Sequence, residues 1–243
     1  MFITTLSINV GRSRANCSLV MDVFSFVDLL FIVDPPRKVD GGGVVHEHVD
    51  FDLFSFVRAS GVEVFVRSSL SGLFLVDLHD MVTCVIMYDE GGVRRRIGGV
   101  YVPPGTKKLE WLTYEAAWDY CDFLMGDFNA KHDSWNHDSR TGRKNAISDC
   151  HGLWLTQFCD RNGLRVHPPT GCTFPNISAI DLFIGGSTTR VSYDGKAGLE
   201  HVAVIARLEV DEPTDMVRRR PAWRKIPASD CDDIWTHVDS GAG

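Results

Sequence analysis

Long apolar runs and paired cysteines are both missing from this sequence of 243 residues. No apolar run approaches the roughly 18 residues that a membrane-spanning helix needs. The amino terminus, MFITTLSINV, lacks the basic and apolar segments of a secretory signal. The seven cysteines are odd in number, widely spaced and form no CxxC pair, which argues against a disulfide framework and a structural zinc site. We therefore expect an intracellular protein in a reducing compartment.

An excess of positive charge is missing too, because 32 acidic residues outnumber 25 basic residues and the formal net charge is −7. This balance ordinarily counts against a nucleic-acid partner, since Lys and Arg make the contacts to phosphate. The basic residues are clustered, however, with three consecutive arginines at 94–96 and three more at 218–220. A metal site also requires local negative charge, so the total charge does not exclude a metal-dependent enzyme that acts on nucleic acid.

Short apolar segments alternate with polar breaks along the chain. Segments bounded by Gly, Pro or Asp predict strands at 4–10, 28–34, 62–68, 83–88, 97–104, 121–127, 179–185 and 202–210. Helices are predicted at 13–26, 107–120 and 145–163, the last ending at Gly163. This pattern predicts an α/β fold with two packed sheets and helices covering them. One domain is expected at 1–210, followed by a charged, Pro-punctuated linker at 211–243.

Polar side chains stand at or beside the ends of these predicted strands. In chain order they are Asn9, Asp34, Tyr101, Asp127, Asn129, Asp181, Glu200 and His201. Strand ends can gather side chains from distant parts of a sequence around one cleft. One His, one Tyr, two Asn and four carboxylates predict a metal-assisted hydrolytic centre.

These residues, in this order and spacing, resemble the endonuclease/exonuclease/phosphatase superfamily, which includes the apurinic-site endonucleases. The resemblance covers about residues 3–210 and rests on Asn9, the carboxylate after LLFIV, and the segments YVP, GDFNA, SAID and EH. GDFNAKHDSWN, with GVYVPP before it, is similar to the endonuclease domain of non-LTR retrotransposons. INVGRSRA is similar to the group of these elements that inserts into ribosomal DNA or telomeric repeats, and RRRPAWRK with DDIW resembles the segment leading to their reverse transcriptase.

The resemblance implies a fold, a reaction and partners. The implied fold is a four-layer α/β sandwich of two packed mixed β-sheets flanked by helices. The implied reaction is Mg²⁺-dependent nicking of double-stranded target DNA, with Mn²⁺ as an alternative metal, which leaves a 3′-hydroxyl to prime reverse transcription in retrotransposition. The implied partners are target DNA, a reverse transcriptase domain of the same polypeptide and, indirectly, the element RNA. We accordingly expect a nuclear location and no membrane.

The resemblance also implies a metal site in which Asp34 is the principal ligand, with Asn9 and Glu200 assisting directly or through water. The family normally has Glu at the position of Asp34, and Ser-Asp-His where this chain has LEH at 199–201. The two carboxylates are thus kept with their lengths exchanged. Mg²⁺ prefers hard oxygen ligands and retains several waters, so a shifted carboxylate can act through water.

Catalytic roles follow from the same resemblance. Asp127 would align or deprotonate the attacking water, and Asn129 would donate a hydrogen bond to a phosphoryl oxygen. His201 would be the general base, or would bind the phosphate when charged, while Asp181 fixes its tautomer. Tyr101 would stabilise phosphate charge through its hydroxyl.

His132 and Arg12 are the candidate substrate-binding residues. Structural alternatives stay open: His132 is equally typical of a hydrogen-bonded structural histidine, and Asp127 with Asn129 is typical of a capped turn. Asn9 suits a turn cap, and Tyr101 a packing aromatic. Four tryptophans are expected to be core anchors, namely Trp111, Trp118, Trp135 and Trp154. The remaining histidines are expected to be incidental; these are His46, His48, His79, His137, His151, His167 and His237.

Two other functions fit the same sequence. One is a phosphatase or phosphodiesterase of the same fold that acts on lipid or inositol substrates, which the acidic composition would suit. The other is a DNA-docking domain weakened in catalysis by the changes at Asp34 and Glu200. The sequence leaves the target site of the DNA open, because groove-reading loops rather than catalytic motifs decide it.

Overall fold

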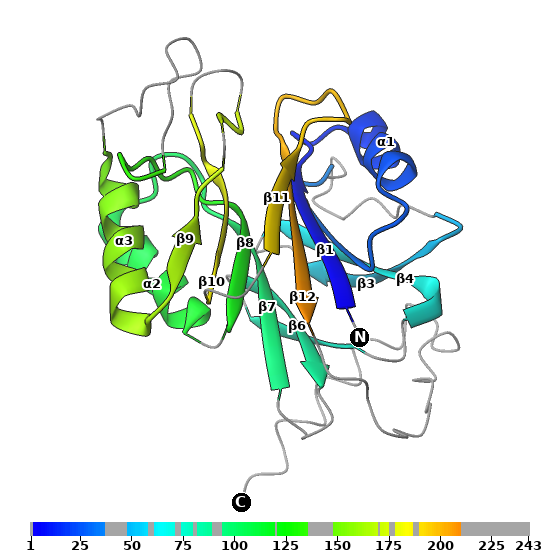
Figure 1. The fold of residues 1–243 in the computed structure, drawn as a ribbon, viewed down its shortest axis with the longest axis horizontal. Coiled ribbons are helices and arrows are strands. Elements are labelled where there is room, and N and C mark those ends of the chain that lie inside the picture. The colour runs from blue at the N-terminus through cyan, green and yellow to red at the C-terminus, as the bar shows by residue number, and fades with distance from the viewer. Residues whose placement is uncertain are drawn as a thin grey trace, which may run out of the picture.

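The chain forms two β-sheets packed face to face, with helices on both outer sides (Figure 1). The structure is a computed structural model and describes residues 2–36, 48–57, 61–70, 74–79, 82–88, 94–119, 121–135, 148–169, 171–174, 178–186 and 190–209. Within these ranges there are twelve strands, three α-helices and one short 3₁₀ helix, Ser68–Leu70. None of the helices described is long and apolar enough to cross a membrane. The predicted linker at 211–243 lies outside the described residues.

The first sheet has the strand order β11-β12-β1-β2-β4-β3. Its strands are β1 (Phe2–Asn9), β2 (Leu29–Val33), β3 (Phe51–Val57), β4 (Val62–Arg67), β11 (Arg190–Asp194) and β12 (Ala203–Glu209). β1 runs parallel to β2, with Asn9 opposite Val33, and antiparallel to β12, with Ser7 opposite Val204. The ends of β1 and β2 and the start of β12 therefore lie at one edge of this sheet.

The second sheet has the order β5-β6-β7-β8-β10-β9. Its strands are β5 (Phe74–His79), β6 (Val82–Tyr88), β7 (Arg94–Tyr101), β8 (Phe123–Asp127), β9 (Arg165–His167) and β10 (Asp181–Gly185). β7 and β8 are parallel, with Tyr101 opposite Asp127, and β10 is antiparallel to β8, with Asp181 opposite Asp127. The ends of β7 and β8 and the start of β10 therefore lie side by side at one end of the second sheet.

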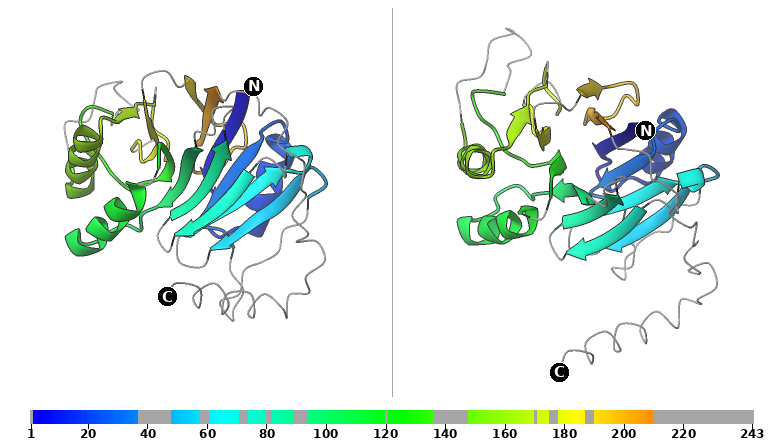
Figure 2. Two further views of the ribbon diagram at one scale, coloured as in Figure 1. Left: turned by 90° about the horizontal axis from the view of Figure 1, so that it is seen from below. Right: turned by 60° about the horizontal axis from the view of Figure 1, so that its bottom comes forward.

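Alternation along the strands divides the apolar residues between three cores. On β2, Leu29, Phe31 and Val33 enter the core between the two sheets, while Leu30 and Ile32 face the opposite way. That opposite face is covered by α1 (Arg14–Val23), and the outer face of the second sheet by α2 (Lys108–Trp118) and α3 (Cys150–Asn162). Figure 2 shows α2 and α3 on one side of the sheets and α1 on the other. The predicted four-layer α/β sandwich is confirmed.

Each of the eight predicted strands has a counterpart in the structure, and four further strands, β3, β5, β9 and β11, were not predicted. The third predicted helix begins later than expected, at Cys150, because Asp149 is extended and its carboxylate accepts a hydrogen bond from the Gly152 N–H at 2.8 Å. It ends as predicted before Gly163, which has a φ of 64°. Residues 145–147 of this prediction lie outside the described residues.

Candidate active site

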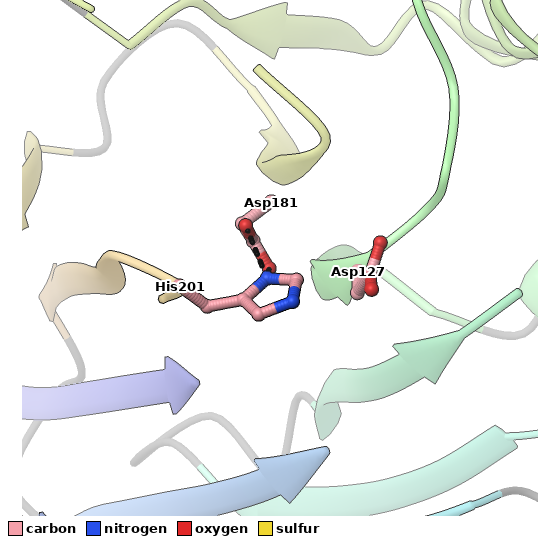
Figure 3. A group of neighbouring side chains, drawn as sticks. All are labelled: Asp127, Asp181 and His201. Atoms are coloured by element: carbon pink, nitrogen blue, oxygen red, sulfur yellow. Dashed lines mark hydrogen bonds and ion pairs between the residues drawn. The ribbon is translucent and has the colours of Figure 1, made fainter. Parts of the chain in front are cut away.

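The two sheets bring their polar strand ends together at one edge of the sandwich. Asn9 ends β1, Asp127 ends β8, Asp181 begins β10, and His201 lies two residues before β12. The ligand-type atoms of Asp127, Asp181 and His201 all lie within 4.8 Å of one another. Figure 3 shows the His201 ring between the two carboxylates. Residues far apart in the sequence thus form one buried polar cluster.

His201 and Asp181 form the most direct pair in this cluster. The Nδ1 atom of His201 lies 2.9 Å from Oδ2 and 3.1 Å from Oδ1 of Asp181 (Figure 3). Asp181 is only 2% exposed and His201 9%. Because Nδ1 is occupied, Nε2 is the ring nitrogen left to meet a substrate or a water. The structure thus contains the pairing that the sequence predicted for these two residues.

Asp127 is held by one hydrogen bond from β1 of the first sheet and one from the turn that follows its own strand, β8. The side-chain amide of Asn9 donates to Oδ2 of Asp127 at 3.0 Å, and the backbone N–H of Asn129 donates to Oδ1 at 2.9 Å. The Asn9 amide is itself oriented, because its oxygen accepts a hydrogen bond from the Gly11 N–H at 2.8 Å. This arrangement fixes which end of the amide faces Asp127. The relative position of the two sheets therefore sets the position of the carboxylate.

Backbone strain is concentrated at this site. Among the residues that the structure describes, the non-glycine residues with positive φ are Arg12 (60°), Asp34 (48°) and Asn129 (44°), and all three are candidate site residues. Such conformations cost of the order of 1–3 kcal/mol each and persist when the surroundings enforce them. For Asp34 the enforcing contacts include the bond from its N–H to the Gly61 carbonyl at 2.8 Å and the bond from the Arg12 N–H to its own carbonyl at 2.8 Å.

Two residues that the sequence analysis did not single out support the His201–Asp181 pair. The hydroxyl of Thr173 accepts hydrogen bonds from the N–H groups of Ile180 at 3.0 Å and Asp181 at 2.9 Å. The ring of Phe174 packs against His201 with 4.6 Å between ring centroids. Neither residue belongs to a recognisable motif.

Burial and mutual charge change the protonation of the cluster. Burial raises the pKa of Asp127 to about 7, and the neighbouring Asp181 charge adds to this, while His201 and the hydrogen bonds from Asn129 and Asn9 oppose it. Burial lowers the pKa of His201, but the hydrogen bond and charge of Asp181, with the Asp127 and Glu200 charges, place it above its ordinary value. Near neutral pH the site therefore favours a charged His201 beside an Asp127 that exchanges its proton readily.

The cluster of Asp127, Asp181 and His201 is chemically able to hold a metal ion. Its oxygen atoms already have partners, however. Both oxygens of Asp181 face His201, and those of Asp127 accept from Asn9 and Asn129. A cation there would have to displace bonds that organise the site.

Asp34 offers a second acidic position at the same edge. It follows β2, next to the end of β1 where Asn9 stands. Its Oδ1 accepts from Nε of Arg12 at 3.0 Å, and the Arg12 side chain is 63% exposed. Glu200 is exposed, and its charge acts on His201. Asp34, Asn9 and Glu200 each carry a hard oxygen atom of the kind that fits Mg²⁺, and Arg12 competes with a cation for Asp34.

The remaining candidates are Tyr101 and His132. Tyr101 is half-buried, stands opposite Asp127 in the register of β7 and β8, and packs on the inter-sheet core. His132 stacks on the buried ring of Trp135 at 4.8 Å, and its Nδ1 accepts from the Ser134 N–H at 3.2 Å. These contacts match the structural alternative for His132. Core positions are confirmed for the buried Trp111, Trp118 and Trp135, and Trp154 is partly buried against the same core.

Comparison with known proteins agrees with this geometry. The family described as Endonuclease-reverse transcriptase matches residues 96–205. No curated protein matches the chain. Among solved structures, the endonuclease domain of TRAS1, a telomere-specific non-LTR retrotransposon, is similar with a TM-score of 0.64 and 14% identity, covering 87% of this chain and 100% of that domain.

Two further solved structures share the fold. The catalytic domain of Xenopus laevis APE2 has a TM-score of 0.55 and 14% identity, covering 87% of this chain and 94% of that one. A functionally unknown conserved protein from Enterococcus faecalis V583 has a TM-score of 0.51 and 12% identity, covering 86% and 100%. These likenesses show that the chain shares the fold of the TRAS1 endonuclease domain and the APE2 catalytic domain, and the family model matched by residues 96–205 agrees with the resemblance seen in the sequence.

Proposed function

We propose that this domain is a Mg²⁺-dependent endonuclease that nicks double-stranded target DNA by phosphodiester hydrolysis. The nick would leave a 3′-hydroxyl, which a reverse transcriptase domain of the same polypeptide would extend in the nucleus. The observation that carries the proposal is the buried cluster in which His201 pairs with Asp181 beside Asp127. The description of the matched family, Endonuclease-reverse transcriptase, supports the coupling to reverse transcription.

The metal would be held by Asp34, with Asn9 and Glu200 assisting. When bound, a divalent cation supplies a Lewis acid that offsets negative charge on the phosphate and the leaving oxygen. The Arg12 guanidinium, at 3.0 Å from Asp34, would have to move away from that carboxylate. Its side chain is largely exposed, so this movement costs little packing.

Asp127 is proposed as the group that aligns and deprotonates the attacking water. General acid–base catalysis works best when the pKa of the catalytic group lies near the working pH, and burial raises the pKa of Asp127 to about 7. The two hydrogen bonds from Asn9 and Asn129 fix the carboxylate in place before any substrate arrives. Preorganisation of this kind lowers the cost of reaching the transition state.

His201 is proposed to bind the scissile phosphate through Nε2 while it carries a positive charge. The paired Asp181 raises the pKa of His201 against the effect of burial, which favours that charged form. Asn129 donates one amide hydrogen to the Val102 carbonyl at 2.9 Å. An amide carries two such hydrogens, and the second would meet a phosphoryl oxygen. The Tyr101 hydroxyl would add a further donor.

Nicking of a supercoiled plasmid tests the proposal. We expect nicked circles with Mg²⁺ and none with EDTA, and we expect a DNA polymerase to extend the nicked strand from its 3′-hydroxyl. Asp127→Asn should lower the rate by about 100-fold or more, the range for loss of a general base. His201→Gln should also lower it by about 100-fold or more, because the phosphate loses a charged partner. His48→Gln is the matched control, because it removes another His–Asp pair, His48 with Asp22 at 3.3 Å, outside the site. It should leave the rate unchanged.

Other results would contradict the proposal in distinct ways. Nicking that persists in EDTA or in Asp127→Asn would come from a contaminant or from another site. Binding to DNA without nicking would identify a docking domain. Phosphate release from inositol phosphates, with no action on DNA, would identify a phosphatase of the same fold.

A further inference from the structure

His151, which the sequence marks as incidental, bridges the two turns that follow β7 and β8. It is the second residue of α3 and only 5% exposed. Its Nδ1 lies 3.0 Å from the carbonyl oxygen of Asn129, and its Nε2 lies 2.8 Å from the carbonyl oxygen of Thr106. One ring thus joins the turn that contains Asn129 to the turn that begins after Tyr101.

Both partners of the His151 ring are hydrogen-bond acceptors. A carbonyl oxygen accepts only, and a neutral imidazole carries a single N–H, whereas an imidazolium donates from both nitrogens. A neutral ring would aim the lone pair of one nitrogen at a carbonyl oxygen at 3.0 Å or less inside the protein. Such an unsatisfied pair of buried acceptors is unfavourable, because neither atom supplies the donor that the other needs.

We infer that His151 is a positioning residue, carried as an imidazolium, that locks Asn129 in place by donating to the Asn129 and Thr106 carbonyls at once. As far as it concerns catalysis, the inference rests on the proposed function, in which Asn129 contacts the phosphate. His151 itself is placed behind Asn129 and acts through it.

The remaining bonds of Asn129 show what His151 completes. Its N–H donates to Asp127 Oδ1 at 2.9 Å and its side chain donates to the Val102 carbonyl at 2.9 Å, while its φ is 44°. The other polar backbone group of Asn129 is its carbonyl, and the His151 ring forms a hydrogen bond with it. Three separate contacts therefore hold a strained residue, as strained positions at functional sites require.

The turn after β7 is tied to the same ring. Thr106 donates its hydroxyl to the Pro103 carbonyl at 2.7 Å, and the Val102 N–H donates to the Asp127 carbonyl at 2.9 Å. With the Asn129–Val102 bond, these contacts form a closed loop of hydrogen bonds that passes through His151. Without His151, the carbonyls of Asn129 and Thr106 would no longer be linked through α3.

Aromatic rings provide the environment for a cation. The His151 ring stacks on Trp111, with 5.2 Å between centroids and 23° between planes, and also lies 5.6 Å from Trp154. The face of an indole ring attracts a cation electrostatically. The amino-terminal end of a helix opposes positive charge, but Asp149 caps this end with a carboxylate.

The first turn of α3 cannot drift away from the Asn129 turn. Asp149 accepts from the Lys131 N–H at 3.1 Å and donates its own N–H to the Lys131 carbonyl at 2.9 Å. A Cβ added at Gly152 would lie 1.9 Å from the Lys131 carbonyl oxygen, so only glycine permits this approach. The start of α3, which carries His151, is therefore held against Lys131, two residues after Asn129.

Nitrogen-15 NMR of the uniformly labelled domain tests the protonation state without DNA or metal. We expect two ring N–H signals correlated to the His151 backbone, one from Nδ1 and one from Nε2, at neutral pH. A single ring N–H would overturn the inference, whatever the activity of the domain. Because the measurement uses the unaltered protein, a variant that fails to fold does not affect it.

Plasmid nicking then tests the positioning role. His151→Gln offers one nitrogen donor group and no charge, so we expect nicking to fall by about 10 to 100-fold, as it does when a supporting partner of a site is lost. The fold is checked by the backbone NMR spectrum, and His48→Gln is the control. An unchanged nicking rate in a folded His151→Gln protein would refute the role. If the unaltered protein does not nick DNA, the proposed function fails, and the two N–H signals still decide the state of His151.

Discussion

Glu63 is a buried carboxyl that the proposed reaction does not use. It lies on β4 opposite Ile32, on the face of the first sheet that α1 covers, and is 4% exposed. Within the described ranges, its Oε2 atom has no hydrogen-bond partner. Burial raises the pKa of the Cys17 thiol on α1, and the nearby charge of Glu63 adds to this rise. Burial raises the pKa of Glu63 from 4.5 to about 7.

The cost of this burial follows from the size of the pKa change. The rise from 4.5 to about 7 is about 2.5 units, and each unit is worth about 1.4 kcal/mol, which gives ~3 kcal/mol. A carboxyl with a raised pKa holds its proton more tightly in the folded protein than in the unfolded chain. The contribution of Glu63 to the free energy of unfolding therefore falls as the pH rises from about 4.5 to about 7, and stays low above that.

Glu63→Gln removes this ionisation and keeps the shape of the side chain. We expect the difference in unfolding free energy between Glu63→Gln and the unaltered protein to grow by ~3 kcal/mol in favour of the variant between pH 4.5 and pH 8. Urea unfolding of both proteins at each pH measures it, and comparison of the two proteins cancels other groups that titrate in this window. Glu209→Gln, at an exposed position, is the control. A difference that does not change with pH would refute the reasoning.

Three further substitutions give distinct results. Asp127→Asn should gain unfolding free energy relative to the unaltered protein, and this gain should be larger at pH 8 than at pH 4, because the pKa of Asp127 rises from 3.8 to about 7 in the folded protein. Urea unfolding of both proteins measures the gain, and an equal gain at both pH values would contradict the prediction. Arg12→Ala frees Asp34 of its counter-charge, so Mn²⁺ titration followed by thermal unfolding should show tighter binding; unchanged or weaker binding would contradict it. Gly126→Ala would place a Cβ 2.0 Å from the Val100 carbonyl oxygen at a φ of 148°, and should lower the unfolding free energy by about 3 kcal/mol or more, measured in urea.

The strands that the sequence did not predict share one property. β11 and β3 are the two edges of the first sheet, and β5 and β9 are the two edges of the second. An edge strand has one neighbour and more contact with water, so it does not need a continuous apolar run. RVH in β9 and RVSYD in β11 are short and polar for this reason. Interior strands such as LLFIV in β2 are buried throughout and were readily predicted.

The candidate site also contains contacts that the sequence predicted and contacts that it did not. The pair formed by His201 and Asp181 was predicted because a known motif order marks both residues, and the structure contains that pair. His151 and Thr173 were not predicted, because their partners are backbone groups that leave no mark in a sequence. The ion pair between Arg12 and Asp34 was not predicted either, since it depends on two strained turns meeting.

The bond between Asn9 and Asp127 links the catalytic chemistry to the core between the sheets. Asn9 belongs to the first sheet and Asp127 to the second, so their 3.0 Å contact depends on how the sheets pack. Phe31 from the first sheet and Met125 from the second lie in that core. If a smaller side chain replaced one of these residues, the cavity it left would let the sheets shift by a fraction of an ångström. Such a shift is enough to weaken a hydrogen bond of this length. Packing between the sheets therefore sets where the Asp127 carboxylate stands.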